Sequence, residues 1–377
     1  MRLLQPFDAL HAALTDPARR ERNIVLVLAL YTMLWTIYGT VAKSGQGLHP
    51  DMTELLGWSQ HLAWGYKHPP FAAALVWLWF KAFPVAAWSY YLLAMLMPAL
   101  TLWIVWHLSA DYLDIEKRVF GLALLTLVPF FNFHALKFNV NTVLMPLWAA
   151  TTFAFLRSYA SRNALYAALA GVAAAACMLG KYWSIFLISG LVAAALIDRR
   201  RAAYFRSAAP WITAAVGFLA LVPHLIWLVR NDFEPFAYAV GVHGAKPLPE
   251  TIIAGLGYLA GSAAYVAVPV IVALVAGRPN RATLVDMVWP ADTDRRLAAA
   301  AFWAPLLLPV IGALLSGTDI TSLWSMSAWT LLPVVLLSPQ AMAISAVDTR
   351  RLLAFAVALP VTMVIVSPAI LHFLPRR

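Results

Sequence analysis

Apolar runs recur along this chain from residue 24 to residue 373, and each run is broken by a short polar or basic connection. Runs of this kind are typical of helices that cross a hydrocarbon core of about 30 Å. Hydrophobic residues make up 62% of the 377 residues and charged residues only 12%, and the mean hydropathy is +0.76. A soluble fold has no means of burying that much apolar surface, so the pattern predicts an all-α integral membrane protein.

About eleven apolar segments are expected to span the membrane as one helical bundle. They are Ile24–Ala42, Trp88–Leu108, Val119–Phe133, Thr142–Leu156, Leu165–Leu179, Trp183–Ile197, Ala208–Val229, Ile252–Ala276, Ala298–Leu315, Ile320–Leu337 and Leu352–Phe373. A further apolar segment, Pro69–Phe83, is shorter, opens with two prolines and contains Lys81. We expect this segment to lie on the membrane surface, within a first outer loop at residues 44–87 that forms interfacial helices.

The distribution of basic residues predicts the orientation of the bundle, because Lys and Arg collect in cytoplasmic connections. With a cytoplasmic N-terminus and Pro69–Phe83 on the surface, the cytoplasmic side carries 18 of the 27 Lys and Arg residues. The opposite orientation would place the basic cluster Asp198–Arg201 outside. Residues 1–23 are therefore expected to form a cytoplasmic leader and residues 24–373 a single transmembrane domain. No separate soluble C-terminal domain is expected.

The net charge of +10 does not indicate a nucleic-acid partner, because the basic residues lie in the connections between spans rather than on one soluble face. The same orientation gathers the unusual polar residues on the outer side. They are Asp51, Glu54, Lys67, His68, His134, Lys137, Asn139, Asn141, Lys181, Tyr182, Arg230 to Glu234 and His243. The chemistry of the protein is therefore expected at one face of the membrane.

Asp51 and Glu54 stand three residues apart in a segment with helical character, so their carboxylates can share one face of a helix. Two carboxylates at a boundary between water and lipid can hold a proton, a cation or a substrate hydroxyl. The same spacing also resembles a helix-capping pair, and the spacing by itself favours the cap. The residues alone leave both interpretations open.

The stretch Asp51–Pro70 resembles the first outer loop of the family 39 glycosyltransferases. These enzymes belong to the GT-C superfamily, with the protein mannosyltransferases and the lipid A aminoarabinose transferases. The motifs that carry the resemblance are Gly65-Tyr66-Lys67-His68-Pro69-Pro70, Lys137-Phe138-Asn139-Val140-Asn141, Leu179-Gly180-Lys181-Tyr182, Pro223-His224-Leu225-Ile226-Trp227 and Phe233-Glu234-Pro235-Phe236 ahead of His243. The resemblance covers roughly residues 24–245, and the last third matches only as further membrane helices.

The resemblance implies a GT-C helical bundle in a bacterial inner membrane, with its active site facing the periplasm. It implies an enzyme that moves a sugar, with inversion, from a polyprenyl-phosphate carrier to a lipid, glycan or protein hydroxyl. Asp51 is then the candidate general base. Relatives commonly pair Asp and Glu directly, whereas Met52 and Thr53 separate them here, so the base stays open between Asp51 and Glu54.

A lipid phosphate that leaves near the membrane surface needs cations to stabilise its charge. Lys181 is the first candidate, with a snorkelling lysine as the alternative, and Lys67, Lys137 and Arg230 are the others. The candidates for contact with the substrate are His68, Tyr66, Asn139, Asn141, Tyr182 and His243. The histidines lack zinc-site spacing, so no metal ligand and no required cofactor is expected, although a divalent cation would be compatible.

Two other classes of function are consistent with a multispan chain. A transporter or flippase for a polyprenyl-linked lipid would show inverted repeats, broken helices at matching positions and ionisable residues at mid-membrane depth. These signs are not convincing in this sequence. A non-catalytic membrane scaffold would have lost both acidic positions of the first outer loop, and both are present. The sequence therefore favours the enzyme.

Overall fold

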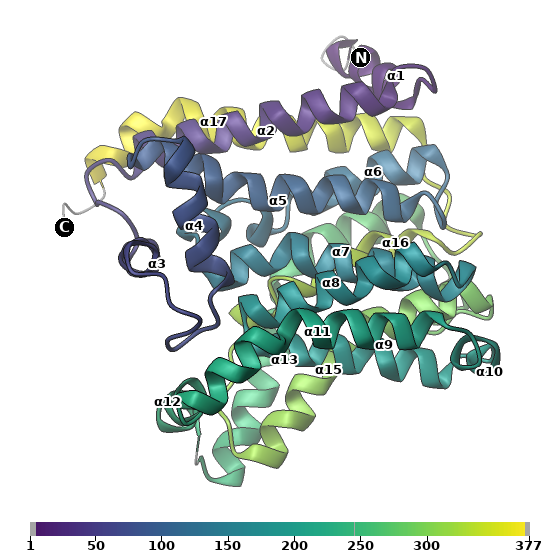
Figure 1. Cartoon of the computed structure of the whole chain (residues 1–377). Helices are drawn as coiled ribbons and strands as arrows, with labels where there is room; N and C mark the ends of the chain where they lie inside the picture. The colour runs from purple at the N-terminus through teal and green to yellow at the C-terminus, as the bar shows by residue number, and fades with distance from the viewer. Residues whose placement is uncertain (1–4, 245, 374–377) are drawn as a thin grey trace.

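The computed structural model describes residues 5–244 and 246–373, and within these ranges every regular element is helical. Long helices run side by side as one bundle, with α2, the first long helix, beside the C-terminal helix α17 (Figure 1). The longer helices are α2 (Arg20–Ala42), α5 (Ala87–Ser109), α6 (Ile115–Thr126), α7 (Val140–Ser161), α8 (Ala164–Gly180), α9 (Ile185–Ile197), α11 (Ala209–Arg230), α13 (Leu248–Gly277), α15 (Thr293–Ser316) and α17 (Ala346–Phe373). The all-α membrane bundle expected from the sequence is confirmed.

Six of the described helices are long and apolar enough to cross a membrane: α2, α5, α11, α13, α15 and α17. A seventh span results if α6 and the turns after it count as one, although the axis bends there by 78°. The other expected spans correspond to α7, to the shorter apolar helices α8 and α9, and to a broken segment after α15. The chain is thus a multispan membrane protein, and the count of eleven spans stays a prediction.

The connections between the long helices collect at the two ends of the bundle (Figure 1). One end carries α3 (Pro50–Gln60), α4 (Phe71–Ala82) and α12 (Glu234–His243), and the other carries α1 (Gln5–Thr15) and α10 (Arg201–Phe205). Helix α4 runs crosswise to α2 and α5 (Figure 1), and its place on the membrane surface stays a prediction. Helix α1 occupies much of the expected leader, of which residues 1–4 lie outside the described residues.

Close contact between α8 and α11 depends on small residues. A Cβ atom on Gly171 would lie 2.6 Å from the carbonyl oxygen of Thr213, so the two backbones approach at a distance that only glycine permits. Gly217 faces Gly171 from α11. Small residues at such positions are the usual means by which membrane helices pack closely. This contact positions the outer parts of α8 and α11, where Lys181 and His224 lie.

Two of the expected spans are broken in the structure. Helix α6 ends at Thr126, and the chain continues as the 3₁₀ turns η2 (Pro129–Phe131) and η3 (Ala135–Lys137), because Pro129 forces an extended backbone at Val128. The segment expected as Ile320–Leu337 forms the turns η5 (Ser322–Ser325) and η6 (Ala328–Leu331) before α16 (Leu332–Leu337). Its serines compete for backbone hydrogen bonds, and Pro333 begins a new helix rather than continuing one.

Candidate functional site

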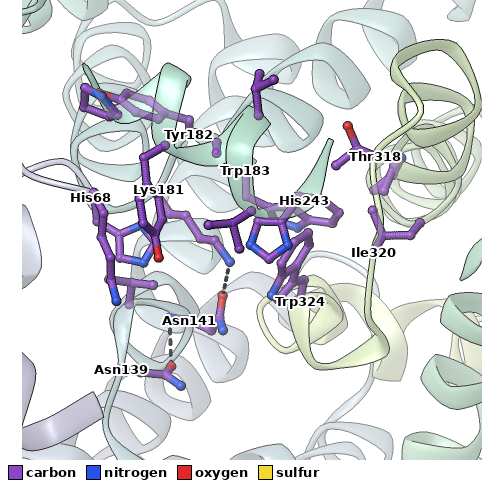
Figure 2. Close-up of a pocket in the computed structure, with 18 of the residues that line it drawn as sticks. His68, Asn139, Asn141, Lys181, Tyr182, Trp183, His243, Thr318, Ile320 and Trp324 are labelled. Carbon is purple, nitrogen blue, oxygen red and sulfur yellow. Dashed lines mark hydrogen bonds between the residues drawn. The ribbon is translucent and has the colours of Figure 1, made fainter. Parts of the chain in front are cut away.

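A cavity of about 730 Å³ opens at the end of the bundle that carries α3 and α12. Figure 2 shows polar side chains of its lining, which come from the first outer loop, the start of α7, the connection after α8, the end of α12 and the segment after α15. Its apolar wall includes Phe186 of α9, Pro309 of α15 and Ile320. The cavity therefore has a polar part beside an apolar part, which suits an amphipathic ligand.

Asp51 lies in the first turn of α3, but it does not cap that helix. The N-cap residue is His49, whose ring nitrogen accepts a hydrogen bond of 3.3 Å from the backbone N–H of Asp51. The side chain of Asp51 instead accepts a hydrogen bond of 2.9 Å from the amide nitrogen of Asn139. The capping interpretation of the Asp51 and Glu54 pair is therefore wrong, since both carboxylates line the cavity.

Asn139 is oriented by its position as the N-cap of α7. Its side-chain oxygen accepts the backbone N–H groups of Asn141 and Thr142 at 3.0 and 3.2 Å. The amide nitrogen is thereby left to face Asp51, so the capping bonds determine which end of the amide meets the carboxylate. The neutral amide therefore orients the carboxylate of Asp51 by donating a hydrogen bond to it.

Helix α5 holds α3 and α7 close enough for Asn139 to reach Asp51. Phe138, directly before Asn139, adopts a left-handed backbone with φ of 31°. Its buried ring packs against the ring of Tyr90, with 5.3 Å between the ring centroids. The Tyr90 hydroxyl donates a hydrogen bond of 2.9 Å to the backbone oxygen of Met52. A non-glycine residue in this backbone region is strained unless its surroundings hold it. The packing of Phe138 thus supports the geometry of the site.

Lys181 lies in the connection between α8 and the short turn η4 (Tyr182–Ser184), and its side chain reaches into the cavity (Figure 2). Its ammonium donates a hydrogen bond of 3.0 Å to the side-chain oxygen of Asn141. The ring centroid of Trp324 lies 4.3 Å from the same nitrogen. Burial lowers the pKa of Lys181 to about 7, and the charge of Asp51 opposes this shift. A nearby anion favours the charged form of a lysine, so an anion that enters the cavity would raise this pKa.

A second cation, Lys67, forms an ion pair with Glu54 on the same wall of the cavity. The ring centroids of Trp58 and Tyr238 lie 5.7 and 5.9 Å from its ammonium. The next residue, His68, is held uncharged, because burial and then the charges of Lys181, Lys67 and His243 lower its pKa to about 3. Glu54 is thus neutralised by a partner, whereas Asp51 keeps a carboxylate that faces the cavity.

Tyr182 connects the cavity to the outer loop through a buried histidine. His224 of α11, which is 2% exposed, donates from Nδ1 to the carbonyl oxygen of Trp64 at 2.7 Å. Its Nε2 atom must then accept, and it does so from the Tyr182 hydroxyl at 2.8 Å. Phe236 of α12 stacks on the Tyr182 ring at 4.7 Å. This chain of contacts fixes the loop that carries Lys67 and His68.

Most of the residues singled out in the sequence line this cavity. They are Asp51, Glu54, Lys67, His68, Asn139, Asn141, Lys181, Tyr182 and His243. Three others are not in the lining. Tyr66 is 55% exposed and packs on Trp58, Arg230 is exposed at the end of α11, and Lys137 lies partly buried at the end of η3. The roles assigned to all twelve stay predictions.

Residues after position 245 were expected only as further membrane helices, yet they form one side of the cavity. Trp324 faces Lys181, and Thr318 and Ser316 line the wall beyond it. Trp183, directly after the Lys181-Tyr182 motif, also lines the cavity. The signal for Trp324 was present as serines that interrupt an apolar run, because such a break marks chain that is not a simple span.

Among the described residues, no three His, Cys, Asp or Glu side chains come together in a way that could hold a metal ion. Asp51 and Glu54 face the cavity, but each has a partner of its own in Asn139 and Lys67. The expectation that no cofactor is required and that a divalent cation would be compatible stays a prediction.

Comparisons with known proteins identify similar sequences and a similar fold. A family model described as dolichyl-phosphate-mannose-protein mannosyltransferase matches residues 67–227. The lipopolysaccharide core galacturonosyltransferase RgtB of Rhizobium johnstonii is 29% identical over 228 residues. That match covers 58% of this chain and 45% of RgtB, so less than half of the relative's length is represented.

Crystal structures of ArnT from Cupriavidus metallidurans have the same fold. The form bound to undecaprenyl phosphate superposes with a TM-score of 0.64 at 13% identity, over 92% of this chain and 71% of that chain. The apo form gives a TM-score of 0.61 at 14% identity, over 93% and 72% of the two chains. The chain therefore has the GT-C fold of ArnT, and its sequence resembles the glycosyltransferases of that superfamily.

Proposed function

We propose that the chain is an inverting glycosyltransferase that takes a sugar from a polyprenyl-phosphate donor. The observation that carries this proposal is that the first turn of α7 holds a carboxylate and a cation in one cavity. Asn139 positions Asp51, and Asn141, two residues later, positions Lys181. The transfer of a sugar from a phosphate carrier requires a base and a phosphate-binding group in one site.

In the proposed reaction, Asp51 accepts the proton of the acceptor hydroxyl as the hydroxyl oxygen attacks the anomeric carbon. A carbon–oxygen bond to the acceptor forms, and the bond between the anomeric carbon and the phosphate oxygen breaks. The polyprenyl phosphate leaves with the electron pair and an additional negative charge. Attack from the side opposite the phosphate inverts the anomeric centre. A positioned carboxylate contributes about 10²–10⁴-fold to such a step.

The charge on the leaving phosphate increases during the reaction, so cations near it stabilise the transition state more than the ground state. Lys181 is the principal group in this role, and Lys67 is the second. Lys181 reaches the cavity from the α8 connection, and α7 points its positive N-terminal end in the same direction. The apolar wall at Phe186, Pro309 and Ile320 accepts the prenyl chain.

The acceptor is a hydroxyl of a lipid, glycan or protein on the periplasmic side of a bacterial inner membrane. The position of the cavity supports this side, because the cavity lies at the end of the bundle opposite the arginine-rich connection around α10 (Figure 1). RgtB is named for transfer to a lipopolysaccharide core. On that ground we favour an envelope glycolipid within the acceptor class.

The test is transfer of a labelled sugar from a polyprenyl-phosphate donor pool in membranes, comparing the wild type with Asp51→Asn. The variant is expected to lose about 10²–10⁴-fold in rate while it still binds polyprenyl phosphate. Asp232→Asn is the matched control, because Asp232 is exposed in the connection between α11 and α12. Full activity of Asp51→Asn would refute the role of Asp51 as the base. If the donor crossed the membrane of sealed vesicles without sugar transfer, equally with the wild type and the variant, the transporter would be favoured.

A further inference from the structure

The indole of Trp324 and the ammonium of Lys181 face each other across the cavity, although 143 residues separate them in the sequence. The distance of 4.3 Å from the nitrogen to the ring centroid lies well within the range of a cation–π contact. Trp324 belongs to η5, in the part of the chain where the sequence suggested only a further span. The contact brings a residue of the last third into direct interaction with the phosphate-binding lysine.

The indole is held in place from two sides. The ring of Trp183 meets it edge-on at 4.8 Å and the ring of His243 at 5.2 Å (Figure 2). The chain before Trp324 is also tied to α12, because the backbone N–H of Asp319 donates to the carbonyl oxygen of His243 at 2.8 Å. A ring that is packed in this way presents one face to Lys181 at little entropic cost.

We propose that Trp324 is a positioning residue that keeps the ammonium of Lys181 charged and directed at the phosphate of the donor. The proposal rests on the proposed function, since it assigns Lys181 to the donor phosphate. Other charged or titratable groups act on Lys181 or are acted on by it, namely Asp51 of α3, His68 of the outer loop and His243 of α12, and Lys67 lines the same cavity. Among them Asp51 favours the charged lysine, and Trp324 adds to that effect through its ring face.

Loss of the indole has a distinct consequence for pH dependence. Burial already lowers the pKa of Lys181 to about 7, and a neutral amine does not hold a phosphate. Without the ring face the charged form loses a stabilising contact, so the pKa falls further. Binding of an anion then begins to weaken at a lower pH. A cation–π contact of ordinary strength corresponds to roughly half to one and a half pH units.

The experiment measures binding of a short polyprenyl methyl phosphate diester to the full-length protein in nanodiscs between pH 5.5 and 9. A diester carries one charge throughout this range, so the ligand does not titrate. Trp324→Leu is expected to bind like the wild type at pH 5.5 and roughly three- to thirtyfold more weakly at pH 8. Trp324→Phe, which keeps a ring face, is expected to lie between the two.

Lys181→Arg, made in the wild type and in Trp324→Leu, supplies the internal control. A guanidinium stays charged across this range, so diester binding by both variants is expected to be independent of pH. Trp77→Leu is the matched control outside the cavity, since Lys81 lies 5.3 Å from the Trp77 ring. If Trp324→Leu weakened diester binding by the same factor at every pH, the indole would only fill space and the proposal would be overturned. A wild type that binds the diester no better than polyprenol would refute the proposed function itself.

Discussion

The side-chain amide of Asn139 donates a hydrogen bond of 2.9 Å to the carboxylate of Asp51, across 88 residues of sequence. The amide can do so because its oxygen is already occupied as the cap of α7. The bond orients Asp51 within the cavity lining, which distinguishes it from Glu54, the carboxylate that pairs with Lys67. The structure therefore suggests different roles for two acidic residues that the sequence could not distinguish.

Asn139→Ser separates the cap of α7 from the contact with Asp51. Serine caps a helix about as well as asparagine but is too short to orient the carboxylate, so stability is expected to change by less than about 0.5 kcal/mol. The transfer rate is expected to fall roughly tenfold to a hundredfold, because a hydrogen bond to a charged group is lost. Asn163→Ser, at the N-cap of α8, is the matched control. An unchanged transfer rate with Asn139→Ser would show that Asn139 does not orient Asp51 for the reaction.

Glu54→Gln tests which carboxylate is the base. The change removes the ion pair that holds Lys67 at the cavity wall, so we expect the KM for the donor to rise by up to about fivefold. The value of kcat is expected to stay within about twofold of the wild type, since Asp51 is untouched. Steady-state transfer with varied donor separates the two parameters. A loss of kcat as large as that of Asp51→Asn would make Glu54 the base.

Gly65→Ala is expected to disturb the loop that carries Lys67 and His68. An added Cβ atom would lie 2.5 and 2.7 Å from two ring atoms of Trp227, so the loop or the indole must move. Overpacking of this kind costs about 1–3 kcal/mol, and transfer should fall with it. Gly57→Ala is the control, because its Cβ atom would meet nothing within 4 Å. Thermal unfolding of both variants in detergent, with transfer assays alongside, checks the difference.

Removal of divalent cations is expected to leave the reaction intact. The positive charge needed near the leaving phosphate is supplied by Lys181 and Lys67, and in the described part of the chain no three acidic, His or Cys side chains could hold a metal ion together. Transfer after treatment with EDTA should stay within about twofold of the untreated rate. If EDTA abolished transfer and Mn²⁺ or Mg²⁺ restored it, a metal held jointly by protein and substrate phosphate would replace this view.

Much of the site could be predicted from short motifs, because each motif keeps its polar residues together whatever the packing. Lys67 and His68 precede two prolines, and Lys181 and Tyr182 end an apolar run, so both pairs were expected at a boundary. Trp324 could not be found in this way. Its run was apolar enough to pass for a span despite the serines that interrupt it, and which residue of the break meets Lys181 depends on how the chain folds.

The sequence by itself determined that this chain is a multispan membrane protein, and it predicted that the unusual polar residues share one face. Hydropathy and the bias of basic residues act on each segment separately, so they can be read without knowing which helices touch. Only the tertiary structure decided that Asp51 meets Asn139, that Glu54 is neutralised by Lys67, and that Trp324 faces Lys181. Two of these contacts join residues far apart in the chain, and all three depend on how the helices and loops pack, which no local pattern specifies.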